Sequence, residues 1–171
     1  MDDQPNLREL LDDVSNFVGE VQGGKGPDNK TAELHLIGEV VEIAGSGSRI
    51  RMNAASLEAL ASHKDLSIAM SGQVGSQVKM VSGNNWLIAN VRTLRGDANG
   101  ELVANVDFLG EGAKSATGNL SGFRRGVTRY PIPGAKVLAV STDDLRAIFA
   151  ASDEPHIEVG TVYPTEDIRG A

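Results

Sequence analysis

The feature that most constrains this chain is the spacing of its apolar residues between positions 34 and 109. Short runs there alternate apolar and polar side chains, which is typical of half-buried strands, and turn-forming residues separate the runs. Several short strands at regular spacing predict a mainly β fold, namely a small antiparallel β-barrel with a few peripheral helices. We expect its first strands at Leu34–Ile43, Arg49–Met52, Leu66–Met70, Val74–Val81, Trp86–Leu94 and Leu102–Leu109.

Three other segments have the three-and-four spacing of a helix. Asn6–Val21 is predicted to be an amphipathic helix, and Asn53–His63 a short helix capped by Asn53. Ser141 and Asp144 form a capping box, which starts a third helix.

The remaining segments complete the predicted organisation of the chain. Strands are expected at Lys136–Val140 and Ile157–Val162, and Gln22–Lys30 has the composition of a flexible linker. We therefore divide the chain into a helix with its linker over 1–30, a barrel core over 31–140, and a capped helix with an exit strand over 141–171.

The composition excludes several kinds of site. The chain has no cysteine, and therefore neither a disulfide framework nor a thiolate metal site. Its three histidines are far apart in sequence and form no metal-binding pair. No apolar run approaches the ~18 residues that a membrane-spanning helix needs. We expect a cytoplasmic protein that contacts no membrane and holds no metal or cofactor of its own.

Phe108–Thr117 looks at first like a phosphate-binding loop, because it follows a predicted strand and contains a Lys-Ser pair. Such a loop needs a glycine directly before the lysine, so that backbone amides can enclose the phosphates. Ala113 is at that position, so we reject the match. The sequence also contains no nucleophile elbow and no recognisable acid–base pair, and we do not expect this chain to be an enzyme.

Charge is distributed unevenly along the chain. The net charge is −7, but residues 112–142 contain five basic side chains and no acidic one. We expect Ala113–Arg129 to be a long loop. A solvated loop is the simpler interpretation, and the alternative is a contact surface for an acidic partner, a neighbouring subunit or a phosphate backbone. The residues that we predict for such an interface are Phe123, Arg124, Arg125, Arg129 and Tyr130.

Short segments, taken in order, carry a resemblance to a known family. They are Ile37–Val41, Val74–Lys79, Val91–Arg92, Phe108–Glu111, Pro131–Val137, Leu145 and Ile157–Thr161. Their order and spacing resemble the N-terminal barrel of HerA-type ATPases of the HerA/FtsK superfamily. This unit is called the HAS-barrel, because a similar barrel begins the catalytic subunits of rotary ATP synthases. The resemblance covers roughly residues 34–165.

The resemblance implies a hexameric motor in which ATPase domains form a ring that translocates DNA. The barrels would form a collar that stabilises the ring and docks a partner, typically a NurA-like nuclease in DNA-end processing, or another effector in phage defence. In that family a P-loop ATPase domain follows the exit strand. ATP and Mg²⁺ are expected only for that domain, which this chain lacks, and no catalytic residue is carried over.

Two other functions remain open from the sequence. The first is a free-standing barrel that binds nucleic acid through its basic loop, with Arg124, Arg125 and Arg129 on phosphates; it predicts strongly salt-dependent DNA binding. The second is a small enzyme with an unrecognised carboxylate site, which no group of residues supports.

Overall fold

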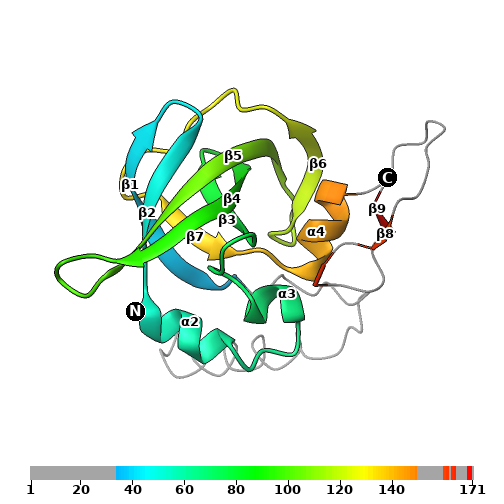
Figure 1. Cartoon of the computed structure of the whole chain (residues 1–171). Coiled ribbons are helices and arrows are strands. Elements are labelled where there is room, and N and C mark those ends of the chain that lie inside the picture. Colours follow the sequence, from blue (N-terminus) through cyan, green and yellow to red (C-terminus); the bar gives the residue numbers. More distant parts are fainter. Residues whose placement is uncertain (1–33, 150–159, 162, 165–168, 171) are drawn as a thin grey trace, which may run out of the picture. The chain divides into compact units, whose positions relative to one another are not determined.

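The computed structural model describes residues 34–149, 160–161, 163–164 and 169–170 (Figure 1). The chain separates into two units, Met1–Lys30 and Thr31–Ala171, and every described residue belongs to the second. The helix predicted at 6–21, the linker to residue 30 and His156 lie outside the described residues. So does most of the strand predicted at 157–162.

Six antiparallel strands close into a barrel, which confirms the predicted fold class. Around the barrel they follow the order β1, β2, β5, β4, β3 and β7, and β7 pairs with β1 again. Their bounds are Leu36–Ala44 for β1, Gly47–Met52 for β2, Gln77–Ser82 for β3, Asn85–Gly96 for β4, Leu102–Lys114 for β5 and Lys136–Ala139 for β7. The pairing of β2 with β5 closes the barrel, with Ile50 opposite Ala104.

Two further pairings lie outside this ring of six strands. β6 (Leu120–Arg125) pairs with the last residues of β5, beyond the part of β5 that β2 occupies. β8 (Gly160–Thr161) and β9 (Arg169–Gly170) form a separate two-stranded sheet.

The alternating pattern of the sequence places one side of each strand in the barrel core. Ile37 and Val40 on β1 and Ile50 on β2 are buried there. Glycine is required at position 38 by the close approach of β1 and β2. A Cβ atom at this position would lie 2.1 Å from the Arg51 carbonyl oxygen, so only glycine allows β1 to approach β2 this closely.

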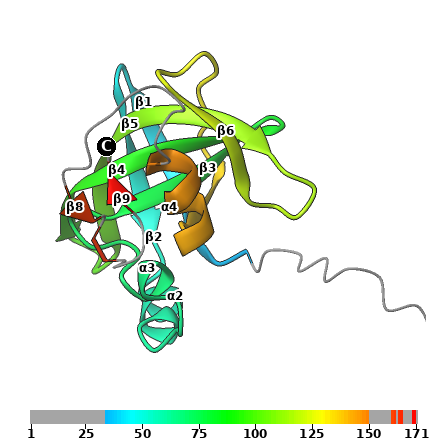
Figure 2. The same cartoon turned by 90° about the vertical axis from the view of Figure 1, so that its right-hand side faces the viewer.

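The two ends of the barrel are closed by different segments. The short helices α2 (Ala54–Leu60) and α3 (Leu66–Ala69) cover one end, as both views show (Figures 1 and 2). The connection from β6 to β7 crosses the opposite end and packs Val127 and Ala135 against the core.

A second apolar cluster lies outside the barrel. Helix α4 (Thr142–Phe149) buries Leu145 and Ile148 against it. Trp86, which is 1% exposed, belongs to the same cluster, as does Leu120 of β6. Helix α4 and β6 therefore share one apolar layer.

The structure corrects three local predictions. Leu66–Met70 is not a strand, because Asp65 caps α3 by accepting the Ser67 N–H; apolar runs this short do not distinguish helix from strand. The strand expected from Val74 begins at Gln77. Ala113–Arg129 is not one long loop, since β5 continues to Lys114 and β6 follows. Within the described ranges, no helix is long and apolar enough to cross a membrane.

Candidate interaction surface

The predicted interface residues lie on β6 and on the connection that follows it, and a buried carboxylate fixes their arrangement. Glu111 of β5 is 1% exposed. Thr128 donates its hydroxyl to Glu111 Oε1 (2.6 Å) and its N–H to Oε2 (3.1 Å). Arg124 Nη2 also donates to Oε1, in an ion pair. Glu111 thus attaches both β6 and the β6–β7 connection to the end of the barrel.

These donors also control the ionisation of the carboxyl group. The hydrogen bonds from Thr128 lower the pKa of Glu111 to about 2, with the Arg124 guanidinium adding to the effect and burial opposing it. Glu111 is therefore charged at neutral pH, and its carboxylate is bound by Arg124 and Thr128 of the same chain. Arg124 in turn is not a free cation, although its side chain is 63% exposed.

Arg129 and Lys114 lie beside the turn between β3 and β4. The Arg129 carbonyl accepts the Ser82 hydroxyl (2.8 Å), and its guanidinium lies 3.0 Å from where a Cβ on Gly83 would be. The Lys114 N–H donates to the Asn84 carbonyl of the same turn (3.3 Å). Both residues thus contact the same turn, and the Lys114 ammonium lies over the Trp86 ring, 4.9 Å from its centroid.

Ion pairs neutralise only some of the basic residues of the barrel. The described range 34–149 contains twelve lysines and arginines and ten acidic residues. Six of these cations have no ion pair with any described residue: Lys64, Arg95, Lys114, Arg125, Arg129 and Lys136. Three of the six, Lys114, Arg125 and Arg129, belong to the β5–β6 hairpin and the connection after it. We call these three residues the basic patch.

The aromatic residues of the predicted interface have different environments. Phe123 is half-buried against the outer apolar cluster, and its ring would contact a side chain at Gly110. The Tyr130 ring lies 5.6 Å from that of Phe108 and is half exposed. Two residues further along, Ile132 is 73% exposed. Tyr130 and Ile132 are thus accessible apolar side chains near the basic patch in sequence, whereas Phe123 is mainly a packing residue.

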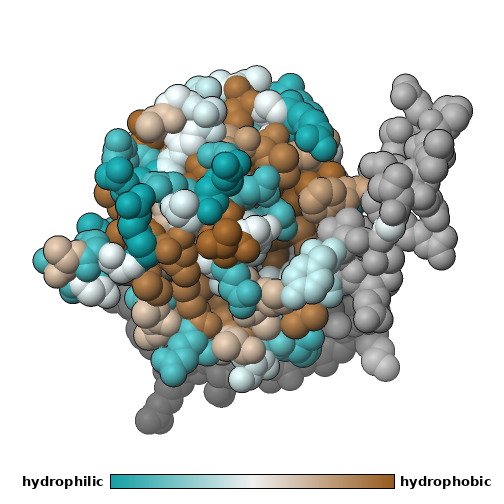
Figure 3. Space-filling view, viewed as in Figure 1, coloured by the Kyte–Doolittle hydropathy of each residue, from teal (hydrophilic) through white to brown (hydrophobic). Residues whose placement is uncertain are grey.

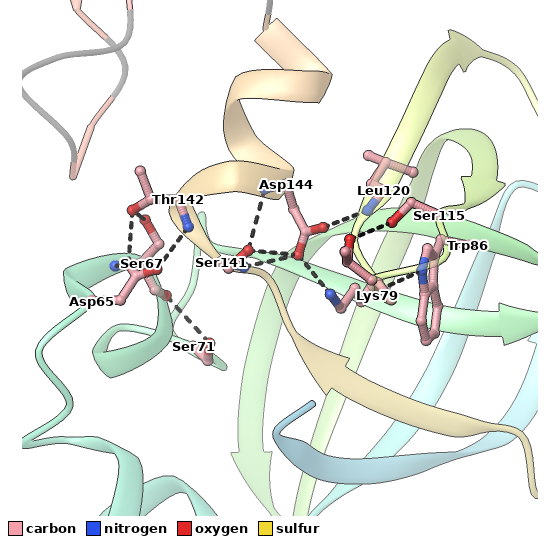
Figure 4. Close-up of polar contacts among 12 residues, drawn as sticks. Asp65, Ser67, Ser71, Lys79, Trp86, Ser115, Leu120, Ser141, Thr142 and Asp144 are labelled. Atoms are coloured by element: carbon pink, nitrogen blue, oxygen red, sulfur yellow. Dashed lines mark hydrogen bonds and ion pairs between the residues drawn. The ribbon is translucent and has the colours of Figure 1, made fainter. Parts of the chain in front are cut away.

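A buried ion pair holds helix α4 against the barrel and β6 (Figure 4). Lys79 Nζ of β3 lies 2.6 Å from Asp144 Oδ2, with side-chain exposures of 3% and 0%. The other Asp144 oxygen accepts the Leu120 N–H (2.8 Å). The predicted capping box is confirmed, because Asp144 and Ser141 exchange backbone and side-chain hydrogen bonds. One aspartate therefore connects the start of α4, the sheet and the start of β6.

A second aspartate, Asp65, joins α3 to α4. Asp65 caps α3 and also accepts the N–H (2.9 Å) and hydroxyl (2.7 Å) of Thr142, the first residue of α4. Partial burial raises the pKa of Asp65, but the hydrogen bonds from Thr142 and Ser67 outweigh it and keep the pKa below its ordinary value. The contact positions α4 relative to the helical end of the barrel.

The segments that carry the family resemblance supply several of these contacts. Lys79 ends one segment and Glu111 another, and Gly110 precedes Glu111. A Cβ at Gly110 would lie 2.2 Å from the Arg124 carbonyl oxygen, so this glycine allows β6 to pair closely with β5. Sequence analysis missed the roles of Lys79 and Glu111. For Lys79 the available signal was its position between two apolar residues of a predicted strand, Val78 and Met80, whereas Glu111 lies between two glycines, which gave no signal.

The described residues can be compared with the requirements of a metal site and of a phosphate-binding loop. They contain no group of three His, Asp or Glu side chains arranged to hold a metal ion. Lys114 ends a strand, and Ser115 begins a turn that leads into another strand, so the rejected phosphate loop has no helix after it.

Two hollows on the barrel surface are also lined by charged side chains and could bind a ligand. One, of about 420 Å³, has Leu36 and Met52 in its lining, with Glu39 and Arg51 also present. The other, of about 350 Å³, is lined by three arginines, Arg49, Arg51 and Arg95. Arg49 and Arg51 are already paired with glutamates of β1, which leaves Arg95 alone unneutralised. The β5–β6 hairpin and the connection after it therefore contain three cations without an ion pair to a described residue, against one at this hollow.

No protein-family model matches the chain, and no curated protein matches it. An inference about function therefore depends on the residues and contacts described above.

Proposed function

We propose that this chain is a HAS-barrel that serves as the assembly and partner-docking domain of a HerA-like, DNA-translocating ATPase. The catalytic domain would follow the barrel and would bind ATP and Mg²⁺, and the protein would act in the cytoplasm. The partners are further copies of the same protein in a ring, and a NurA-like nuclease or another effector. This chain supplies the collar and performs no catalytic step.

The observation that carries the proposal is the position of the resembling segments in the fold. Phe108–Glu111 and Val74–Lys79 contribute the residues that attach β6 and α4 to the barrel. Pro131–Val137 closes the end of the barrel and begins β7. These segments therefore hold β6, α4 and one end of the barrel in place, which supports the proposal because their order and spacing are what resemble the family. The basic patch then provides an exposed surface for assembly or docking.

The test uses the product of the complete gene, in which the ring can form. Replacing Arg125 and Arg129 together with alanine is expected to weaken ring formation or effector recruitment, which sedimentation velocity and a pull-down with the effector measure. Arg95→Ala is the matched control, because Arg95 is also exposed and has no ion pair with a described residue. If the double variant assembles and recruits as the wild type does at all salt concentrations, the patch has no docking role.

Nucleic-acid binding by the barrel itself is the alternative function. It is favoured by the three cations of the basic patch, Lys114, Arg125 and Arg129, which have no ion pair with a described residue. It predicts that the 171-residue chain binds DNA with an affinity that falls steeply as salt rises. The docking proposal predicts no such binding by this chain, so a DNA titration at two salt concentrations separates the two functions.

A further inference from the structure

Strand β6 has an unpaired edge. It is the last strand of its sheet and, within the described part of the chain, it pairs only with β5. Its first residue is covered, because the Leu120 N–H is bound by Asp144 of α4. The rest of the strand is more open, because Gly122, Arg124 and Arg125 are exposed. Gly122 has a φ of +60°, at the point where β6 has one extra residue relative to β5, so the regular part of the edge is Phe123–Arg125. An unpaired strand edge is a template for a further strand.

The surroundings of this edge are positively charged. Arg124 and Arg125 lie on β6 itself, and no acidic residue occurs between positions 112 and 142. Glu111, the nearest acid on β5, is occupied by Thr128 and Arg124. Figure 3, viewed as in Figure 1, shows hydrophilic side chains over the end of β6 at upper right.

We propose that the edge of β6 from Phe123 to Arg125 binds an extended, acidic segment of a partner protein by strand addition. The partner's backbone would continue the sheet beyond β6, and its carboxylates would pair with Arg125, the cation of β6 that has no ion pair with a described residue. This inference rests on the proposed docking function and names the chemistry of the docked partner.

The charges argue against two other occupants. If a second copy paired through its own β6, Arg124 and Arg125 would face the same arginines of the partner copy, and like charges opposite each other destabilise a strand pair. A nucleic acid would be attracted by the patch but has no peptide groups to pair with the strand edge. An acidic peptide strand satisfies both the edge and the charge.

The probe is a synthetic peptide of about seven residues, a usual strand length, with alternating glutamate and valine and blocked ends. A second peptide has the same sequence with alternate backbone amides methylated, which removes the N–H donors and keeps the charge. A third has lysine in place of glutamate. Fluorescence anisotropy with the 171-residue chain is expected to show binding of the first peptide, and binding at least about tenfold weaker for the other two.

Variants locate the binding site. Arg125→Glu is expected to weaken binding of the first peptide at least about tenfold. Arg95→Glu is the matched control and should leave binding unchanged, because Arg95 is an exposed cation on β4 that has no ion pair with a described residue. Arg124 is kept, since it holds Glu111. Bound peptide should also slow amide hydrogen exchange at residues 122–126.

Three results would each overturn the inference. The methylated peptide could bind as well as the unmodified one, which would mean that charge alone acts. A single-stranded oligonucleotide could bind through Arg125 while the peptides do not. The first peptide could fail to bind at about millimolar concentration. The peptide assay needs no ATPase domain, so its failure is distinguishable from failure of the proposed function, which ring formation and recruitment measure separately.

Discussion

Replacing Lys79 with methionine should lower the free energy of unfolding by about 3 kcal/mol. Removing one partner of a buried ion pair costs about 3–5 kcal/mol, because the other charge is left without compensation. Here Asp144 keeps three hydrogen-bond donors, the N–H of Leu120 and the N–H and hydroxyl of Ser141, at 2.8–3.0 Å. The cost should therefore fall at the low end of the range.

Asp144→Asn should cost more, about 5 kcal/mol, although the side chain keeps its shape. The ammonium of Lys79 would stay buried without an anion. The asparagine NH₂ group would also replace an acceptor oxygen that now receives a hydrogen bond from Leu120 or from Lys79 and Ser141. At least one donor would then lack its acceptor.

Urea unfolding measures both losses, and the single tryptophan is a local reporter. The Trp86 ring centroid lies 5.1 Å from Lys79 Nζ, and its indole N–H donates to the Gly118 carbonyl (3.0 Å). Arg92→Ala is the control, because its ion pair with Asp107 is exposed and should contribute less than about 1 kcal/mol.

The size of the loss of stability in Lys79→Met is the critical result. A loss below about 1 kcal/mol for Lys79→Met would refute the argument, because the buried pair would then be no more important than an exposed one. If Asp144→Asn does not fold, the double variant with Lys79→Met remains informative. Removing both charges should be less harmful than the sum of the single changes, since the two residues interact directly.

Three further predictions concern β6 and its connection. Ionised Glu111 stabilises the folded protein above pH 4.5, and this stability should be lost as pH falls from about 4.5 to 2, because the pKa of Glu111 is lowered to about 2 by folding. Thr128→Val should raise the pKa of Glu111 in the folded protein and so reduce the loss of stability between pH 6 and 3, measured by urea unfolding. Gly110→Ala should lower the free energy of unfolding by about 1–3 kcal/mol, the usual cost of overpacking. Gly96→Ala, with open space around its Cβ, should be near neutral in the same assay. Thermal unfolding should show that Arg124→Ala lowers the melting temperature and Arg125→Ala does not, because only Arg124 contacts a buried carboxylate; equal effects would be inconsistent with this.

Local signals in the sequence predicted much of the fold. The alternation of apolar residues identified most barrel strands, and Asn53 accepts the Ser56 N–H as a predicted helix cap should. The capping box at Ser141 and Asp144 was likewise readable, because its two residues are three positions apart. Each of these features depends on neighbouring residues only.

The missed features depend on contacts between distant residues. Lys79 and Asp144 are 65 positions apart, and Asp65 and Thr142 are 77 apart, so neither pair can be recognised without the fold. The glycines of the β5–β6 hairpin indicated a loop, but they are needed where strands approach closely, as at Gly110. The basic segment could be recognised from its charge. That Arg124 is paired with Glu111, and is therefore not available to a partner, could be recognised only from the fold.

The most direct test of the central claim is to sequence the reading frame that encodes this chain beyond the codon of Ala171. The account predicts a phosphate-binding loop, G-x-x-x-x-G-K-[ST], within a few dozen residues, preceded by a strand and followed by a helix. A reading frame that continues into a domain without that motif, or that stops at once, would contradict the proposal that this barrel belongs to a HerA-like ATPase.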